Sequence, residues 1–167
     1  MHRTPRPPVS LLDRYTGSEP LPLYTTTAVV TGRESAHGRS SGHARAATGE
    51  LDLPLRLLVE LGGAGGGTNP EQLFAAGFTA CFHGALTPVA MKRRIRVPPD
   101  LTISASATFQ RDPSDGLFEI ELDVEVSMPG VDLDDARALV AETEAICPYA
   151  KMARGGIRHA VRVIGAR

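Results

Sequence analysis

The stretch that decides the fold reads TNPEQLFAAGFTACFHGAL and covers residues 68–86. It opens with helix-start signals, because Thr68 or Asn69 can cap a helix and proline is favoured at the first helical position. The residues from 73 onward are apolar all the way round a helix: Leu73, Phe74, Ala75, Phe78, Cys81, Phe82, Ala85, Leu86 and Val89. A helix that is apolar on every side is expected to be buried on every side. We therefore predict a buried central helix that contains Cys81.

The segments before this helix predict strands. Residues 23–31 are rich in β-branched side chains, a short strand is expected at 43–48, and residues 51–58 alternate as a strand does. Pro54 favours an edge position for the last of these, because proline cannot donate to a sheet ladder. The glycine-rich run at 62–67 allows close approach to another chain segment or to a ligand. It lacks the Lys-Ser/Thr of a phosphate-binding loop, which argues against that role.

The segments after the helix complete an α+β pattern. Residues 101–110 predict a strand. Residues 117–128 alternate strictly between apolar and polar, as in a strand of a sheet with one solvent-exposed face. A second helix begins at Asp132 or Asp134 and runs to about residue 146, and residues 157–164 predict a closing strand. This order predicts an α+β domain with antiparallel sheet packed around helices.

Length and charge bound the class of protein. The 167 residues fit one domain over 23–167, preceded by a proline-rich arm at 1–22. The net charge of −1 provides no basic field for nucleic acid or for an anionic membrane. We see neither a signal peptide nor a segment of transmembrane length and polarity, so we expect a cytoplasmic protein without a membrane partner.

A second cysteine lies in AICPYA, residues 145–150. The stripe that contains Leu133, Ala136, Val140, Thr143 and Cys147 should face the core, which already holds the helix of Cys81. Both thiols should thus point into the interior from elements that pack together. Free cysteines often pack as small hydrophobes, so two inert core thiols are the plain interpretation.

Two other chemistries are open for these cysteines. Cys81, His83 and Cys147, with His159 or His37, could form a zinc site, although the usual CxxC and HxxxH spacings are absent. A cysteine nucleophile with a histidine base could transfer acyl groups, but no local pattern provides an oxyanion hole.

The run ELGGAGGGTNPEQLFAAGFTACFHGAL and the later ICPYAKMARGGI, with Arg154 and Gly155 in place, resemble the two cysteine motifs of the organic hydroperoxide resistance family, within the OsmC-like superfamily. The resemblance covers about residues 23–166. It implies the OsmC-like fold, with antiparallel sheets wrapped around a buried central helix in an intertwined homodimer. It also implies active sites at the subunit interface, with no bound metal or organic cofactor.

The activity implied by the resemblance is thiol-dependent reduction of organic hydroperoxides. Cys81 matches the peroxidatic cysteine, Cys147 the resolving cysteine and Glu71 a site glutamate. The reductant implied is a dithiol such as dihydrolipoamide, or a lipoylated protein. A guanidinium beside Cys81 would favour its thiolate, and a carboxylate would hold that guanidinium in place. An apolar pocket lined by Phe74, Phe78 and Phe82 would favour alkyl and fatty-acid hydroperoxides.

The site arginine has two candidates, because TGRESAHGRSSG is longer than the family's turn at this point. Arg33 keeps the family's TG-Arg-acid context. Arg39 follows a glycine and lies at a sequence distance from Cys81 nearer to that of the family, and we prefer it.

The positions of Glu71 and Cys81 raise a geometric question. Ten residues of continuous helix would separate them by about 15 Å. Either the helix breaks, with Gly77 as the candidate, or the glutamate comes from the other subunit. The alternative function is an OsmC-like dimer that binds an apolar ligand with little peroxidase turnover.

Overall fold

The computed structural model describes residues 13–32, 35–36 and 39–163. The chain divides into two compact units, residues 1–70 and residues 71–167. Residues 13–22, the described part of the predicted arm, are exposed and form no helix or strand.

The first unit contains a three-stranded antiparallel sheet in the order β1-β4-β5. Its strands are β1 (Ala28–Thr31), β4 (Gly42–Ala46) and β5 (Asp52–Leu55). Pro54 lies in β5 at the edge of the sheet, which confirms the sequence prediction. Two short strands, β2 (Ser35–Ala36) and β3 (Arg39–Ser40), pair within the predicted polar loop.

The glycine-rich run serves close backbone packing in this unit. It follows the short 3₁₀ helix η1 (Val59–Leu61) and folds back on the end of β5. A Cβ added to Gly63 would lie 2.2 Å from the Leu57 carbonyl oxygen, and one added to Gly67 would lie 2.5 Å from the Arg56 Cγ. These glycines are thus required by contacts with the chain itself, one of the two uses that the sequence allowed.

The second unit is built on the long helix α1 (Pro70–Arg93), which begins at the predicted proline. Its core side consists of Phe78, Phe82, Leu86, Val89 and Ala90, all buried. The opposite face, with Gln72, Ala76, Ala80 and Gly84, is exposed. The prediction of burial on every side is therefore wrong for the single chain. This face has small or polar side chains in place of the large ones that fill the core.

The composition of α1 also passes a simple test for a membrane span. An 18-residue window of this helix has a mean hydropathy of 1.4, and no other helix in the described part of the chain qualifies. The expectation that no such segment exists is therefore wrong as regards composition. Core helices of globular proteins pass the same test, and the buried residues of α1 pack into the core of the second unit.

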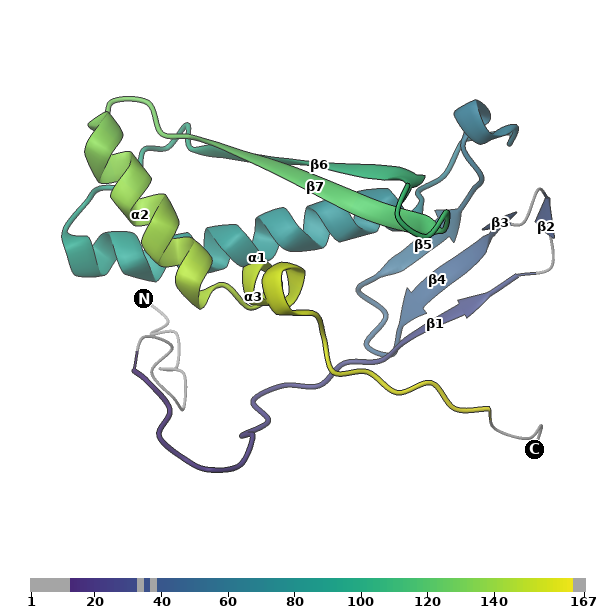
Figure 1. Ribbon diagram of the computed structural model, residues 1–167, viewed down its shortest axis with the longest axis horizontal. Coiled ribbons are helices and arrows are strands. Elements are labelled where there is room, and N and C mark those ends of the chain that lie inside the picture. The colour runs from purple at the N-terminus through teal and green to yellow at the C-terminus, as the bar shows by residue number, and fades with distance from the viewer. Residues whose placement is uncertain (1–12, 33–34, 37–38, 164–167) are drawn as a thin grey trace. The chain divides into compact units, whose positions relative to one another are not determined.

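A long hairpin and a second helix cover the core side of α1 (Figure 1). The hairpin strands are β6 (Thr102–Arg111) and β7 (Phe118–Ser127), which pair antiparallel along their whole length. Leu122, Val124 and Val126 on β7 pack against the core, while Asp123 and Glu125 between them are exposed. The predicted period-two alternation is therefore confirmed in this part of the strand.

Helix α2 (Leu133–Ile146) begins at the N-cap Asp132, whose carboxylate accepts from the backbone N–H groups of Asp134 and Asp135. Leu139, Thr143 and Cys147 form its fully buried stripe. Leu133, predicted to belong to this stripe, is exposed because it lies in the first turn, beyond the core. Beyond Cys147 the chain forms a third helix, α3 (Pro148–Gly155), which the sequence analysis missed. Pro148 ends α2, as predicted, and is also the first residue of α3.

The predicted closing strand at 157–164 is absent from its described part, residues 157–163. Ile157, Val161 and Val163 are exposed, with Val163 wholly so. A strand forms only where a neighbouring strand accepts its hydrogen bonds, and this segment has alternating side chains but pairs with no strand among the residues that the structure describes.

Candidate active site

Cys81 lies in the middle of α1, between the core residues Phe78 and Phe82. Its side chain packs at the margin of the core and is only partly buried. No disulfide is formed, and both cysteines are free thiols. A partly accessible thiol can meet a small molecule from solvent, so Cys81 is the more reachable of the two sulfurs.

Cys147 lies at the corner between α2 and α3 and is fully buried. Its backbone is fixed on both sides, because its N–H donates to the Thr143 carbonyl and its own carbonyl accepts from the Lys151 N–H, each at 2.9 Å. Its thiol donates to the Cys81 sulfur across 3.6 Å. The periodicity argument that both sulfurs point into one interior region is therefore confirmed.

The pKa of Cys81 is raised from its ordinary value in this arrangement. Burial is the largest cause, and the neighbouring Cys147 thiol raises the pKa further. The backbone N–H of Tyr149, which donates to the Cys81 sulfur, acts in the opposite direction and lowers it. A cation would be needed beside this sulfur to make it mostly thiolate at neutral pH.

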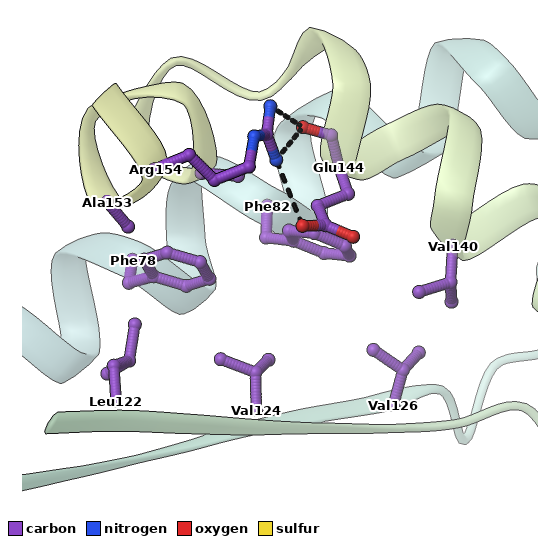
Figure 2. A pocket seen from close by; sticks show the side chains of 10 residues that line it. Phe78, Phe82, Leu122, Val124, Val126, Val140, Glu144, Ala153 and Arg154 are labelled. Carbon is purple, nitrogen blue, oxygen red and sulfur yellow. Dashed lines mark hydrogen bonds and ion pairs between the residues drawn. The ribbon is translucent and has the colours of Figure 1, made fainter.

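An ion pair between Glu144 of α2 and Arg154 of α3 joins the two helices that flank Cys147 in the sequence; Figure 2 shows this pair. The Arg154 guanidinium donates to the Glu144 carboxylate at 2.9 Å and, through two nitrogens, to the Glu144 backbone carbonyl at 3.1 Å. It thereby also satisfies one of the last carbonyls of α2. No role for this arginine was predicted from the sequence. The signal available was Pro148 directly after Cys147, which favours a new helix start.

A cavity of about 300 Å³ opens beside this ion pair. In Figure 2, Phe78 and Phe82 on α1 face a row of β7 side chains across the cavity, with Arg154 and Glu144 along another side. Its full lining is Phe78, Phe82, Leu122, Val124, Val126, Val140, Glu144, Ala150, Ala153 and Arg154. Phe78 and Phe82 are two of the three predicted pocket residues. The third, Phe74, is not part of the lining.

Glu71 is buried in the first turn of α1, and no helix break separates it from Cys81. Gly77 lies inside the continuous helix, so of the two alternatives the helix break at Gly77 is wrong. Packing explains this glycine, because the Tyr149 ring occupies the space beside it. A separation of ten positions along the helix places Glu71 and Cys81 of one chain about 15 Å apart along the axis.

The two candidate arginines belong to the first unit of the chain. Arg39 lies in β3, where it pairs with Ala36, and Arg33 lies outside the described residues. A role for either one at Cys81 stays a prediction.

The zinc interpretation finds no support in the described part of the chain. No three His, Cys, Asp or Glu side chains gather there in a way that could hold a metal ion. His83 and His159 are exposed, and His37 lies outside the described residues.

Comparison with known proteins decides the family. The sequence model of the family described as OsmC-like protein matches residues 63–162. An organic hydroperoxide resistance protein of Xanthomonas axonopodis is 40% identical over 136 residues, which are 81% of this chain and 90% of that protein. The chain belongs to the organic hydroperoxide resistance family of OsmC-like proteins. OhrB of Bacillus subtilis, another member, is 37% identical over 78% of this chain and 94% of its own length.

The fold agrees with this family. A crystal structure of an organic hydroperoxide resistance protein from Legionella pneumophila matches with a TM-score of 0.70 and 38% identity, and the match covers 81% of this chain and 93% of that one. The predicted α+β class with antiparallel sheets and the OsmC-like fold are therefore confirmed.

Proposed function

We propose that this protein is a cysteine-based peroxidase that reduces organic hydroperoxides to alcohols. The observation that carries the proposal is the contact between a partly accessible thiol, Cys81, and a fully buried thiol, Cys147, across 3.6 Å. Two inert core thiols would not require such a contact. Relatives named for organic hydroperoxide resistance support the same activity.

The first step is attack of the Cys81 thiolate on a peroxide oxygen. The O–O bond breaks, the sulfur becomes a sulfenic acid, and the departing alkoxide takes a proton to become the alcohol. The sulfur is oxidised by two electrons and the hydroperoxide is reduced by two. The exposure of Cys81, which exceeds that of Cys147, supports Cys81 as the sulfur attacked first.

The second step joins the two sulfurs. The Cys147 sulfur attacks the sulfenic acid, a Cys81–Cys147 disulfide forms, and the sulfenic oxygen leaves as water. An external dithiol then exchanges with the disulfide and leaves as its own disulfide, which restores both thiols. Dihydrolipoamide, free or on a lipoylated protein, is the proposed dithiol, and the cytoplasm is the proposed setting.

Thiolate formation at Cys81 is assigned to an arginine, with Arg39 preferred over Arg33. The raised pKa of Cys81, caused first by its burial, is the reason that a cation is needed. The proposed active form is a homodimer, and Glu71 acts at the Cys81 of the partner subunit. The continuity of α1 between these two residues supports this assignment over one within a single chain.

The cavity beside Phe78 and Phe82 is the proposed site for the alkyl part of the substrate. Its lining of aliphatic and aromatic side chains, with one ion pair beside it, resembles the composition of small-molecule pockets. An apolar lining favours alkyl hydroperoxides over hydrogen peroxide, because burial of alkyl groups contributes roughly 25 cal/mol per Å².

The test is consumption of cumene hydroperoxide by the purified protein with dihydrolipoamide. We expect turnover that is abolished in Cys81→Ser and retained in Ala80→Ser, which adds a hydroxyl at the exposed neighbouring position on the same helix. If Cys81→Ser consumed hydroperoxide at the parent rate, the peroxidase proposal would be wrong. Binding of an apolar probe without turnover would favour the alternative of an apolar-ligand-binding protein.

A further inference from the structure

The ring of Tyr149 lies against α1 one turn before Cys81. A Cβ added to Gly77 would lie 3.2 Å from the Tyr149 hydroxyl oxygen and 3.4 Å from its Cε1. Phe78 meets the same ring edge-on, with ring centroids 6.4 Å apart and an interplanar angle of 88°. Two adjacent residues of α1 therefore determine where this ring can lie.

The backbone of Tyr149 reaches the reacting sulfur. Tyr149 is the second residue of α3, so its N–H is one of the first in that helix and has no acceptor inside it. This N–H donates to the Cys81 sulfur. A donor favours the thiolate over the neutral thiol, and the positive end of the α3 dipole acts in the same sense.

We propose that Tyr149 is a positioning residue for Cys81, and that its ring, seated against Gly77, holds its own backbone N–H on the Cys81 sulfur. The inference deepens the proposed function, since it rests on Cys81 being the reacting thiol. It assigns Gly77 a role other than that of a helix break: the absence of a side chain makes room for the ring. It also accounts for the tyrosine in the CPY sequence, which otherwise is only one more core side chain.

The same contact fixes the second thiol. Cys147 lies two residues before Tyr149, and the intervening Pro148 has a restricted φ angle. A ring held against Gly77 therefore also limits how far the Cys147 sulfur can move from Cys81. Loss of the ring should weaken both the N–H donation and the alignment of the two sulfurs.

A purely structural role for Tyr149 would change stability and leave the chemistry of the Cys81 sulfur unchanged. The experiment is therefore a titration of Cys81 in a Cys147→Ser background, where Cys81 is the one remaining cysteine. The rate of alkylation by iodoacetamide is measured against pH, and its midpoint reports the thiolate. Thermal unfolding of each variant is recorded alongside.

We expect Tyr149→Ala to move the midpoint upward by about one pH unit, which lowers alkylation about tenfold below the midpoint. Tyr149→Phe keeps the ring and should leave the midpoint unchanged. Gly77→Ala should move the midpoint upward by less. Adding Tyr149→Phe to Gly77→Ala should restore it, because the hydroxyl oxygen is the nearest atom to the new Cβ.

Two results would overturn the proposal. One is a midpoint for Tyr149→Ala equal to that of the parent, and the other is an upward shift in Tyr149→Phe as large as that in Tyr149→Ala. If Tyr149→Ala is unfolded at the assay temperature, Tyr149→Leu takes its place under the same criteria, because leucine keeps apolar volume without the ring.

This titration is independent of peroxidase activity. Iodoacetamide reports Cys81 without any hydroperoxide, so a failed peroxidase assay would leave its outcome standing. Conversely, a Cys81-dependent peroxidase whose Tyr149→Ala midpoint does not move would refute only the role of Tyr149.

Discussion

The sulfurs of Cys81 and Cys147 lie 3.6 Å apart, although 66 positions separate them in the sequence. Two constraints bring them together: Cys81 is held within the long helix α1, and Cys147 is held at the α2–α3 corner by backbone hydrogen bonds on both sides. Little movement is then needed to form a bond between them.

One equivalent of cumene hydroperoxide should convert the protein to a form with a Cys81–Cys147 disulfide, because the buried thiol is already in contact with the sulfur that is oxidised. Peptide mapping by mass spectrometry under non-reducing conditions checks this. In Cys147→Ser, excess peroxide should instead carry Cys81 to sulfinic and sulfonic acids. A stable sulfenic acid in the parent, without the cross-link, would contradict the resolving role.

Release of the α2–α3 corner should slow disulfide formation. Arg154→Gln removes the charge that holds Glu144, so the Cys147 sulfur should align less well with the Cys81 sulfur. A partly exposed ion pair contributes roughly 1 kcal/mol, so its loss should slow cross-linking about threefold to tenfold. Stopped-flow mixing followed by acid quench gives the rate. Arg137→Gln, which breaks the exposed pair with Asp134 in the first turn of α2, is the matched control and should cross-link at the parent rate.

The site arginine should be found by comparing Arg39→Ala with Arg33→Ala. Burial raises the pKa of Cys81, and a guanidinium beside the sulfur would lower it, so loss of that guanidinium should raise the pKa by about one to two units. The rate of hydroperoxide reduction against pH should shift to higher pH in one variant and stay fixed in the other. We expect the shift in Arg39→Ala. Unchanged profiles in both variants would remove arginine from thiolate formation.

Bulk added to the cavity should reduce its use by large substrates. Val124→Phe extends a ring from β7 toward Phe78 and Phe82, so the KM for cumene hydroperoxide should rise more than the KM for tert-butyl hydroperoxide. Asp123→Asn, on the exposed face of the same strand, is the control and should change neither. Equal changes for the two substrates in Val124→Phe would mean that this cavity does not hold the alkyl group.

The elements that the sequence predicted well are those in which the pattern and the packing agree. Residues 122–126 alternate because one face of this part of β7 packs against the core on α1, and the alternation is visible without knowledge of the partner. Pro54 indicated an edge strand by the missing donor alone. Periodicity correctly placed Cys147 toward the core. It wrongly placed Leu133, at the other end of the same stripe, in the core, because the stripe extends one turn beyond the core.

Three of the failures have a common cause, since each depended on what lies next to a segment and not on the segment itself. Residues 157–163 alternate as a strand does but pair with no strand in the described part of the chain. Gly77 was interpreted through backbone freedom, whereas the nearby Tyr149 ring explains it. The partner of Arg154 depends on the third helix, which no periodicity over eight residues could establish.

The unbroken helix between Glu71 and Cys81 leads to a test by mixing two variants. If Glu71 acts at the partner's thiol, a dimer of one Glu71→Ala chain and one Cys81→Ser chain has one intact site, with its glutamate and thiol on different chains. Each variant alone should have little activity. Random mixing after reversible unfolding makes half of the dimers mixed, so about a quarter of the parent activity should return. Glu60→Ala, at an exposed glutamate that precedes α1, is the matched control. Mixed with Cys81→Ser it should give about half of the parent activity, because its homodimers keep both sites and its mixed dimers keep one. Activity that stays at the level of the separate variants would contradict this assignment and place Glu71 and Cys81 of one chain in the same site. Such a site would require a change in α1, because a straight helix separates the two residues by about 15 Å.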